Sequence, residues 1–116
     1  VRGPNRALGL ALAALVLGAL ILDALPAAAG ADAAAGRKRA AACQACHGLD
    51  GLSKLPEAPN LAGQVEVYLV KALREYRDGT RRNAVMNVVA KDLSDADIDD
   101  LAAYYGGLQI EVLPPG

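Results

Sequence analysis

The stretch Cys43-Gln44-Ala45-Cys46-His47 (CQACH) contains both cysteines of the chain and its only histidine. Thiols and imidazole are the side chains that proteins use for metal binding and for redox or covalent chemistry. Because residues i and i+3 of a helical turn share one face, the two thiols are expected to point in the same direction. We therefore interpret CQACH as a site of chemistry and analyse the rest of the sequence outward from it.

Four interpretations of CQACH compete. A disulfide between Cys43 and Cys46 would close a very small loop, stabilise the chain little and leave His47 without a role. A thioredoxin-like redox pair requires a βαβ setting, for which the sequence shows no strand pattern. A zinc site needs four ligands, and the sequence has no further cysteine or histidine. Covalent haem attachment uses all three side chains, because the thiols add to the two vinyl groups of the porphyrin and the imidazole binds the iron.

A methionine is the candidate for the other axial position of the iron. The sequence has no second histidine and one methionine, Met86. A lone methionine is ordinarily a flexible filler of a core, but a thioether is also a standard partner of histidine in electron-transfer haem and raises its reduction potential. We expect Cys43, Cys46, His47 and Met86 to bind the cofactor, with His47 and Met86 as iron ligands, and we expect no catalytic residue.

Residues 1–31 predict an export signal. Two arginines precede the uncharged apolar run Ala7–Leu22, and Asp23 ends this run before a series of alanines and glycines. The run is shorter than the about 20 residues that span a bilayer. We therefore expect cleavage after Ala29 or Ala31 and a mature chain in the periplasm. The alternative is an uncleaved anchor, in which case the chain would be attached to a membrane.

The composition indicates a small domain with an unusual core. Lys+Arg number 12 and Asp+Glu number 13, so the chain has no general basic surface and we expect no nucleic-acid partner. Phe and Trp are absent and Tyr numbers only 4, which leaves few large side chains to fill a core. A domain of this size and composition requires a staple or a cofactor at its centre.

The remainder of the sequence predicts an all-α domain over residues 32–108, followed by a tail at residues 109–116. We expect one helix over Ala33–Ala45 and a second over Gln64–Arg77, with a loop rich in glycine and proline between them. A short helical turn is expected within residues 80–92. No internal repeat is present.

The last expected helix has the clearest signals. Ser94 is a good N-cap, and Asp97 is placed to bond back to it in a variant of the capping box. Ile98, Leu101 and Tyr105 then fall on one face at helical spacing. Two successive glycines end the helix, so we expect this apolar face to pack in the core.

Together these pieces resemble class I cytochromes c of the bacterial periplasm, in particular the short monohaem type that is also found as one half of dihaem cytochromes c. The resemblance covers about residues 33–108 and rests mainly on AAAGRKRAAACQACHGLDGLS and LSDADIDDLAAYY. It implies a small fold of three to four helices around one covalently bound haem c. It also implies a monomer that exchanges electrons with redox proteins such as a membrane cytochrome complex, an oxidase or a dehydrogenase.

The resemblance implies roles for further residues. Gly36 corresponds to the glycine that lets the first and last helices cross closely, with Tyr104 or Tyr105 packed at the crossing. Pro59 corresponds to the proline whose carbonyl accepts a hydrogen bond from the proximal histidine, which would make His47 more electron-donating. An ordinary loop proline is the alternative.

Arg81, Arg82 and Asn83 are candidates to meet the haem propionates, because guanidinium groups pair well with carboxylates. Ordinary surface charge is the alternative for the two arginines. The function expected from the whole pattern is electron transfer rather than enzymatic catalysis. A haem-c gas sensor or small haem enzyme with a displaceable sixth ligand is the alternative, and Met86 together with the small size of the domain favours the carrier.

Overall fold

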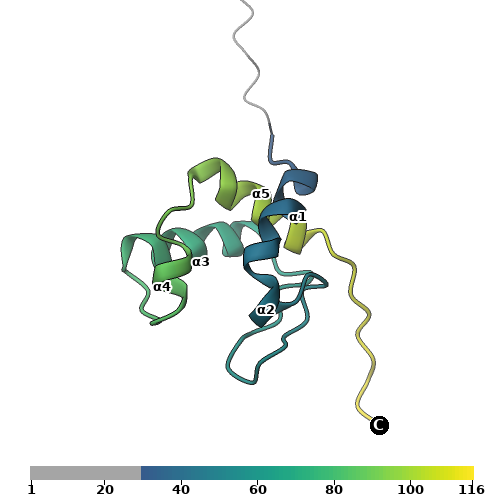
Figure 1. The fold of residues 1–116 in the computed structure, drawn as a ribbon. Coiled ribbons are helices and arrows are strands. Elements are labelled where there is room, and N and C mark those ends of the chain that lie inside the picture. The colour runs from purple at the N-terminus through teal and green to yellow at the C-terminus, as the bar shows by residue number, and fades with distance from the viewer. Residues whose placement is uncertain (1–29) are drawn as a thin grey trace, which may run out of the picture.

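The computed structural model describes residues 30–116, so the expected export signal lies almost wholly outside the described residues. Every regular element in residues 30–116 is a helix: α1 (Ala33–Arg39), the 3-10 turn η1 (Ala40–Ala42), α2 (Gln44–His47), α3 (Glu66–Asp78), α4 (Met86–Val89) and α5 (Asp95–Gly106). The predicted all-α class is confirmed (Figure 1). No helix in this part of the chain is both long enough and apolar enough to cross a membrane.

The first predicted helix is divided into three pieces, which is one reason why the structure has more helices than the three to four expected. The carboxylate of Asp32 accepts hydrogen bonds from the amides of Ala34 and Ala35, at 2.8 and 3.2 Å, and so begins α1. After α1 the backbone tightens into η1, and α2 then carries CQACH to its end. Gly48 terminates α2 with a φ of 72°, a conformation that favours glycine.

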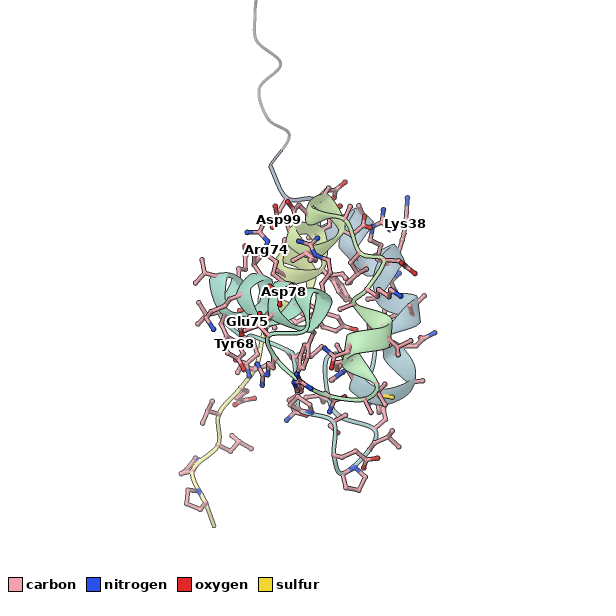
Figure 2. The ribbon with its side chains drawn as sticks, turned by 90° about the vertical axis from the view of Figure 1, so that its left-hand side faces the viewer. Lys38, Tyr68, Arg74, Glu75, Asp78 and Asp99 are labelled. Carbon is pink, nitrogen blue, oxygen red and sulfur yellow. The ribbon has the colours of Figure 1, made fainter. Side chains whose placement is uncertain are left out.

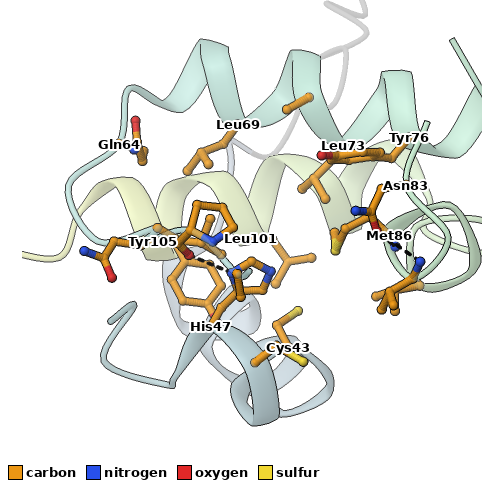
Figure 3. A pocket seen from close by; sticks show the side chains of 18 of the residues that line it. Cys43, His47, Gln64, Leu69, Leu73, Tyr76, Asn83, Met86, Leu101 and Tyr105 are labelled. Atoms are coloured by element: carbon orange, nitrogen blue, oxygen red, sulfur yellow. Dashed lines mark hydrogen bonds between the residues drawn. The ribbon is translucent and has the colours of Figure 1, made fainter. Parts of the chain in front are cut away.

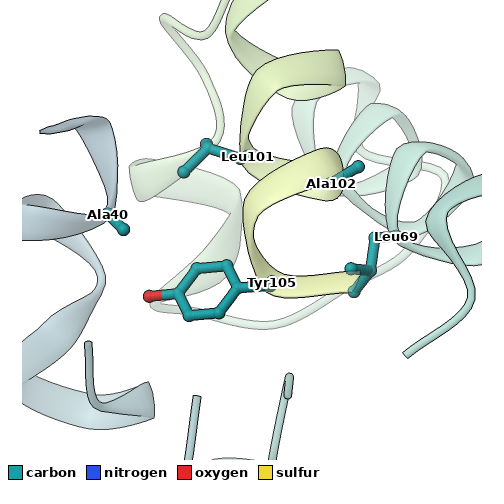
Figure 4. Packing of buried hydrophobic residues seen from close by; sticks show 5 residues of the cluster. All are labelled: Ala40, Leu69, Leu101, Ala102 and Tyr105. Atoms are coloured by element: carbon teal, nitrogen blue, oxygen red, sulfur yellow. The ribbon is translucent and has the colours of Figure 1, made fainter. Parts of the chain in front are cut away.

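The first and last helices cross at Gly36, as expected. A Cβ atom at this position would lie 1.9 Å from the backbone oxygen of Asp100 and 2.9 Å from Cβ of Tyr104. Only glycine therefore permits α1 and α5 to approach this closely. Tyr104 is the tyrosine at the crossing, whereas Tyr105 points into the buried cluster (Figure 4).

The core is built from few and mostly small side chains. Its main cluster consists of Ala40, Leu69, Leu101, Ala102 and Tyr105 (Figure 4). Ile98 is the one large side chain that is fully buried among the described residues. A cluster of this kind stabilises the packing of α5 on α1 and α3 but leaves room beside it.

Hydrogen bonds and ion pairs fix the start of α5. The predicted capping box is confirmed: the Ser94 hydroxyl accepts from the Asp97 amide at 3.1 Å, and the Asp97 carboxylate accepts from the Ser94 amide at 3.0 Å. Arg77 on α3 donates to Asp95 at 2.7 Å. Arg74 and Asp99 face each other at 3.6 Å across the same α3–α5 boundary (Figure 2). These contacts orient α5 relative to α3.

Candidate functional site

A cavity of about 410 Å³ lies beside the buried cluster, and CQACH forms part of its wall. The other walls come from the loop of residues 55–64, from α3, from residues 81–89 and from α5, and most of the lining side chains are apolar (Figure 3). Its volume falls within the range of about 300–1,000 Å³ that small-molecule and cofactor sites occupy. The structure thus brings all four residues of the predicted site, Cys43, Cys46, His47 and Met86, to one cavity.

Both thiols are free and half-buried at this wall. Cys43 precedes α2 and Cys46 lies within it, so the short helix presents the two sulfur atoms to the same space. Burial, and to a smaller extent the neighbouring Cys46, raises the pKa of the Cys43 thiol. The protonated thiol of Cys43 is therefore favoured over the thiolate in this environment.

The ring of His47 is buried and oriented by a main-chain carbonyl. Nδ1 lies 2.8 Å from the carbonyl oxygen of Pro59, which confirms the bond expected from the resemblance. Because a carbonyl oxygen only accepts hydrogen bonds, Nδ1 carries the proton, and Nε2 is the ring nitrogen available to bind a metal. This is the form of histidine that binds a metal, with the ring held by a hydrogen bond behind it.

Met86 reaches the cavity from a different wall. It is the first residue of α4, and its side chain lies on the side of the cavity away from α2 (Figure 3). The donor set is therefore two thiols and an imidazole from α2 and the residue before it, and a thioether from α4. Two thiols suited to covalent attachment, an imidazole, a soft thioether and an apolar lining fit a haem and do not fit a hydrated hard cation.

The expected propionate residues differ in their positions. Arg81 and Asn83 line the cavity, whereas Arg82 does not. The Arg81 guanidinium lies 4.8 Å from the centre of the Tyr76 ring and donates to the Tyr68 hydroxyl at 3.3 Å. The side-chain oxygen of Asn83 accepts hydrogen bonds from the backbone amides of Val85 and Met86. Contact of Arg81 or Asn83 with propionates stays a prediction.

Two tyrosine hydroxyls form contacts that the sequence did not reveal. The Tyr105 hydroxyl donates to the carbonyl of Gly48 at 3.1 Å, and the Tyr104 hydroxyl donates to the carbonyl of Leu49 at 2.7 Å. Both bonds tie α5 to the backbone directly after His47. Burial, followed by nearby Cys43, holds the pKa of Tyr105 well above its ordinary value, so this donor is retained at every physiological pH.

A small helical fold in which a C-x-x-C-H stretch and a methionine line one cavity, with the histidine bonded to a proline carbonyl, defines a class I c-type cytochrome. Residues 33–108 match the family model described as cytochrome c. The chain therefore belongs to the cytochrome c family.

Similar proteins agree with this assignment. The chain is 46% identical over 84 residues to cytochrome c4 of Pseudomonas aeruginosa, in a match that covers 72% of this chain and 42% of that protein. It is 49% identical over 77 residues to cytochrome c-554(548) of Halomonas halodenitrificans, covering 64% of this chain and 93% of that protein. The crystal structure of reduced recombinant cytochrome c4 from Pseudomonas stutzeri matches with a TM-score of 0.65 at 39% identity, covering 69% of this chain and 47% of that one. The chain thus spans less than half of these cytochromes c4 and nearly all of the shorter relative.

Proposed function

We propose that this chain is a carrier of single electrons, in which Cys43, Cys46 and His47 hold one haem c and Met86 supplies the second axial ligand. The observation that carries the proposal is the convergence of these four side chains on one apolar cavity. The bound haem supplies an iron that alternates between the ferric and ferrous states. The chain attaches and orients the haem and excludes water from the cavity.

The two thiols anchor the cofactor. Cys43 and Cys46 would each hold the haem through a thioether bond, formed when an S–H group adds across a vinyl group without any oxidant or reductant. Two bonds from residues at the start and within one short helix would also restrict the position of His47, the next residue.

The axial residues hold the iron in one coordination state. The Nδ1–H of His47 donates to the Pro59 carbonyl, which orients the ring and makes Nε2 a stronger electron donor. The Met86 thioether favours the ferrous state and raises the reduction potential. With His47 and Met86 both bound to the iron, electron transfer would require no ligand exchange and no substrate pocket.

We further assign residues 1–31 to an export signal, residues 32–108 to the haem domain and residues 109–116 to a tail. The family match over residues 33–108 supports the domain, and residues 109–116 carry no regular secondary structure. The proposed setting is the periplasm, where the chain acts as a monomer. Its partners are redox proteins of the dehydrogenase, oxidase or membrane cytochrome type.

The proposal is tested on the full chain expressed in a bacterium competent for cytochrome maturation. Intact mass should equal the polypeptide plus one haem, and the oxidised protein should show the near-infrared band of methionine bound to iron. Met86→Ala should keep the covalent haem, lose this band and acquire a lower reduction potential. Val88→Ala, on an exposed neighbour in α4, is the matched control.

Two results would count against the carrier. A mass without haem would contradict attachment at CQACH. A Met86→Ala protein with the spectrum and potential of the wild type would exclude Met86 as ligand, and the sensor or enzyme alternative would then be favoured.

A further inference from the structure

The short helix that carries Met86 is held by hydrogen bonds and not by burial. α4 buries none of its own residues, and Val85 and Val88 beside Met86 are exposed. Apolar anchoring resumes only at Ala90, which is fully buried after the end of the helix. Within the protein, polar contacts of residues 81–87 therefore fix the backbone of α4 to α3 and to the loop before it.

Asn87 connects α4 to α3. Its side-chain Nδ2 donates two hydrogen bonds, to the carbonyl of Tyr76 on α3 at 2.7 Å and to the carbonyl of Arg81 in the connecting loop at 2.8 Å. Its Oδ1 accepts from the backbone amide of Asn83 at 2.7 Å. One amide side chain thus uses both donors and its acceptor to close the loop between the two helices.

Asn83 continues this chain of bonds to the methionine. Its Oδ1 accepts from the backbone amides of Val85 at 3.0 Å and of Met86 at 2.9 Å. An asparagine that bonds the amides two and three residues later fixes a local turn. The backbone of Met86 is therefore connected through Asn83 and Asn87 to the carbonyl of Tyr76.

We propose that Asn83 and Asn87 form an asparagine latch, a pair of positioning residues that holds the Met86 thioether in the cavity. The latch rests on the proposed function, because it presumes that Met86 is the second iron ligand. Neither asparagine touches the iron in this role. Each acts through the backbone, and together they set how rarely Met86 leaves its position.

The two asparagines have different chemical requirements, and this difference makes the latch testable. Asn87 must donate, so a carboxylate at position 87 loses both donors and repels the carbonyls of Tyr76 and Arg81. Asn83 is used only as an acceptor toward Val85 and Met86, so a carboxylate at position 83 keeps both bonds. The same exchange, Asn to Asp, should therefore damage the latch at one position and preserve it at the other.

The experiment uses the full haem-loaded chain and two measurements: the near-infrared methionine–iron band of the oxidised form, and the association rate of carbon monoxide with the reduced form. Asn87→Asp should weaken the band and speed carbon monoxide association roughly tenfold, the shift that two lost hydrogen bonds produce. Asn83→Asp keeps both acceptor bonds, so it should change the band and the rate far less than Asn87→Asp does. Far-UV circular dichroism should show equal helix content in all variants.

Further variants separate the latch from general effects. Gln109→Glu removes a side-chain donor to the Gly107 carbonyl in the exposed tail and should change neither measurement. Asn83→Ala removes the acceptor oxygen of the latch and should change both measurements in the same direction as Asn87→Asp. It therefore tests the latch if Asn87→Asp does not accumulate. Met86→Ala sets the upper limit for carbon monoxide association.

The outcomes distinguish the latch from the function on which it rests. The latch is wrong if Met86→Ala speeds carbon monoxide association while Asn87→Asp and Asn83→Ala match the wild type. In that case the assignment of Met86 as ligand is kept. The latch would also be wrong if Asn83→Asp and Asn87→Asp changed the band and the carbon monoxide rate equally. The added charge alone would then explain both results. If Met86→Ala itself changes nothing, the ligand assignment is wrong.

Discussion

His47 and Met86 are held in the cavity wall by different means. His47 is only 7% exposed, and its ring is fixed by the bond of 2.8 Å to the Pro59 carbonyl. Met86 belongs to a helix that buries none of its residues. We therefore expect ligand exchange at the iron to occur on the Met86 side, since this is the side where less packing has to be disrupted.

Tyr105→Phe tests the hydroxyl that supports the backbone after His47. The change leaves the buried ring in place but removes the donor to the Gly48 carbonyl. The Gly48 carbonyl keeps its hydrogen bond from the Gly51 amide, so the change removes one net hydrogen bond, and the free energy of unfolding should fall by about 0.5–1.5 kcal/mol. Denaturant unfolding of the haem-loaded protein measures the loss.

Tyr68→Phe is the comparison, because Tyr68 is 46% exposed and water can replace its hydrogen bond with Arg81. It should cost well under 1 kcal/mol, on the order of an exposed contact. Equal effects of the two changes would show that the Tyr105 hydroxyl contributes nothing specific.

The residues that the sequence revealed at the site are those with a chemical or local signature. CQACH and Met86 were identified because of their side-chain chemistry, and the family resemblance added Pro59. The Tyr105 hydroxyl bonds a main-chain carbonyl 57 positions away, and the Asn87 amide bonds carbonyls on α3 and in the loop. Every residue has a carbonyl, so no sequence pattern identifies such a partner.

At the scale of elements, local signals predicted helix ends better than helix interiors. The Ser94–Asp97 capping box depends on residues three apart and was predicted correctly. The division of the first helix into α1, η1 and α2 was not predicted. An alanine-rich run favours helix of either kind, so no residue of this run marks where the backbone tightens.

Gly36→Ala tests the crossing of α1 and α5. The added Cβ atom would overlap the Asp100 carbonyl, so the helices must separate. Overpacking of this kind typically costs about 1–3 kcal/mol, and we expect at least this loss despite the higher helix propensity of alanine. Thermal unfolding of the haem-loaded protein is the measurement.

Gly116→Ala is the control, because a Cβ atom there meets nothing within 4 Å and the residue lies in the tail, away from the crossing. It should leave the unfolding temperature unchanged. An unfolding temperature equally unchanged in Gly36→Ala would mean that the two helices tolerate separation and that the crossing is not a tight one.

In the whole molecule, the core consists of the cavity together with the side chains around it. The buried cluster has a single ring, Tyr105, and the space beside it measures about 410 Å³. Leu69, Leu101 and Tyr105 face this space on one side and the cluster on the other. A chain without its cofactor would leave these side chains without an apolar neighbour, and such voids are costly.

We therefore predict that the apoprotein is largely unfolded. Chain produced without maturation factors should show little helical signal in far-UV circular dichroism and no cooperative thermal transition. The haem-loaded chain should show both. A cooperative and fully helical apoprotein would demonstrate that the protein side chains alone suffice for the fold.

The crossing at Gly36 also determines the order in which the domain can form. Next to it, the Asp32 amide donates to the Asp100 carboxylate at 2.7 Å across 68 positions of sequence. Closing a loop of this length costs on the order of 4 kcal/mol in chain entropy, and the contact yields nothing until α5 has been synthesised. The contacts of the domain thus form a closed circuit, which is completed where its first and last helices meet.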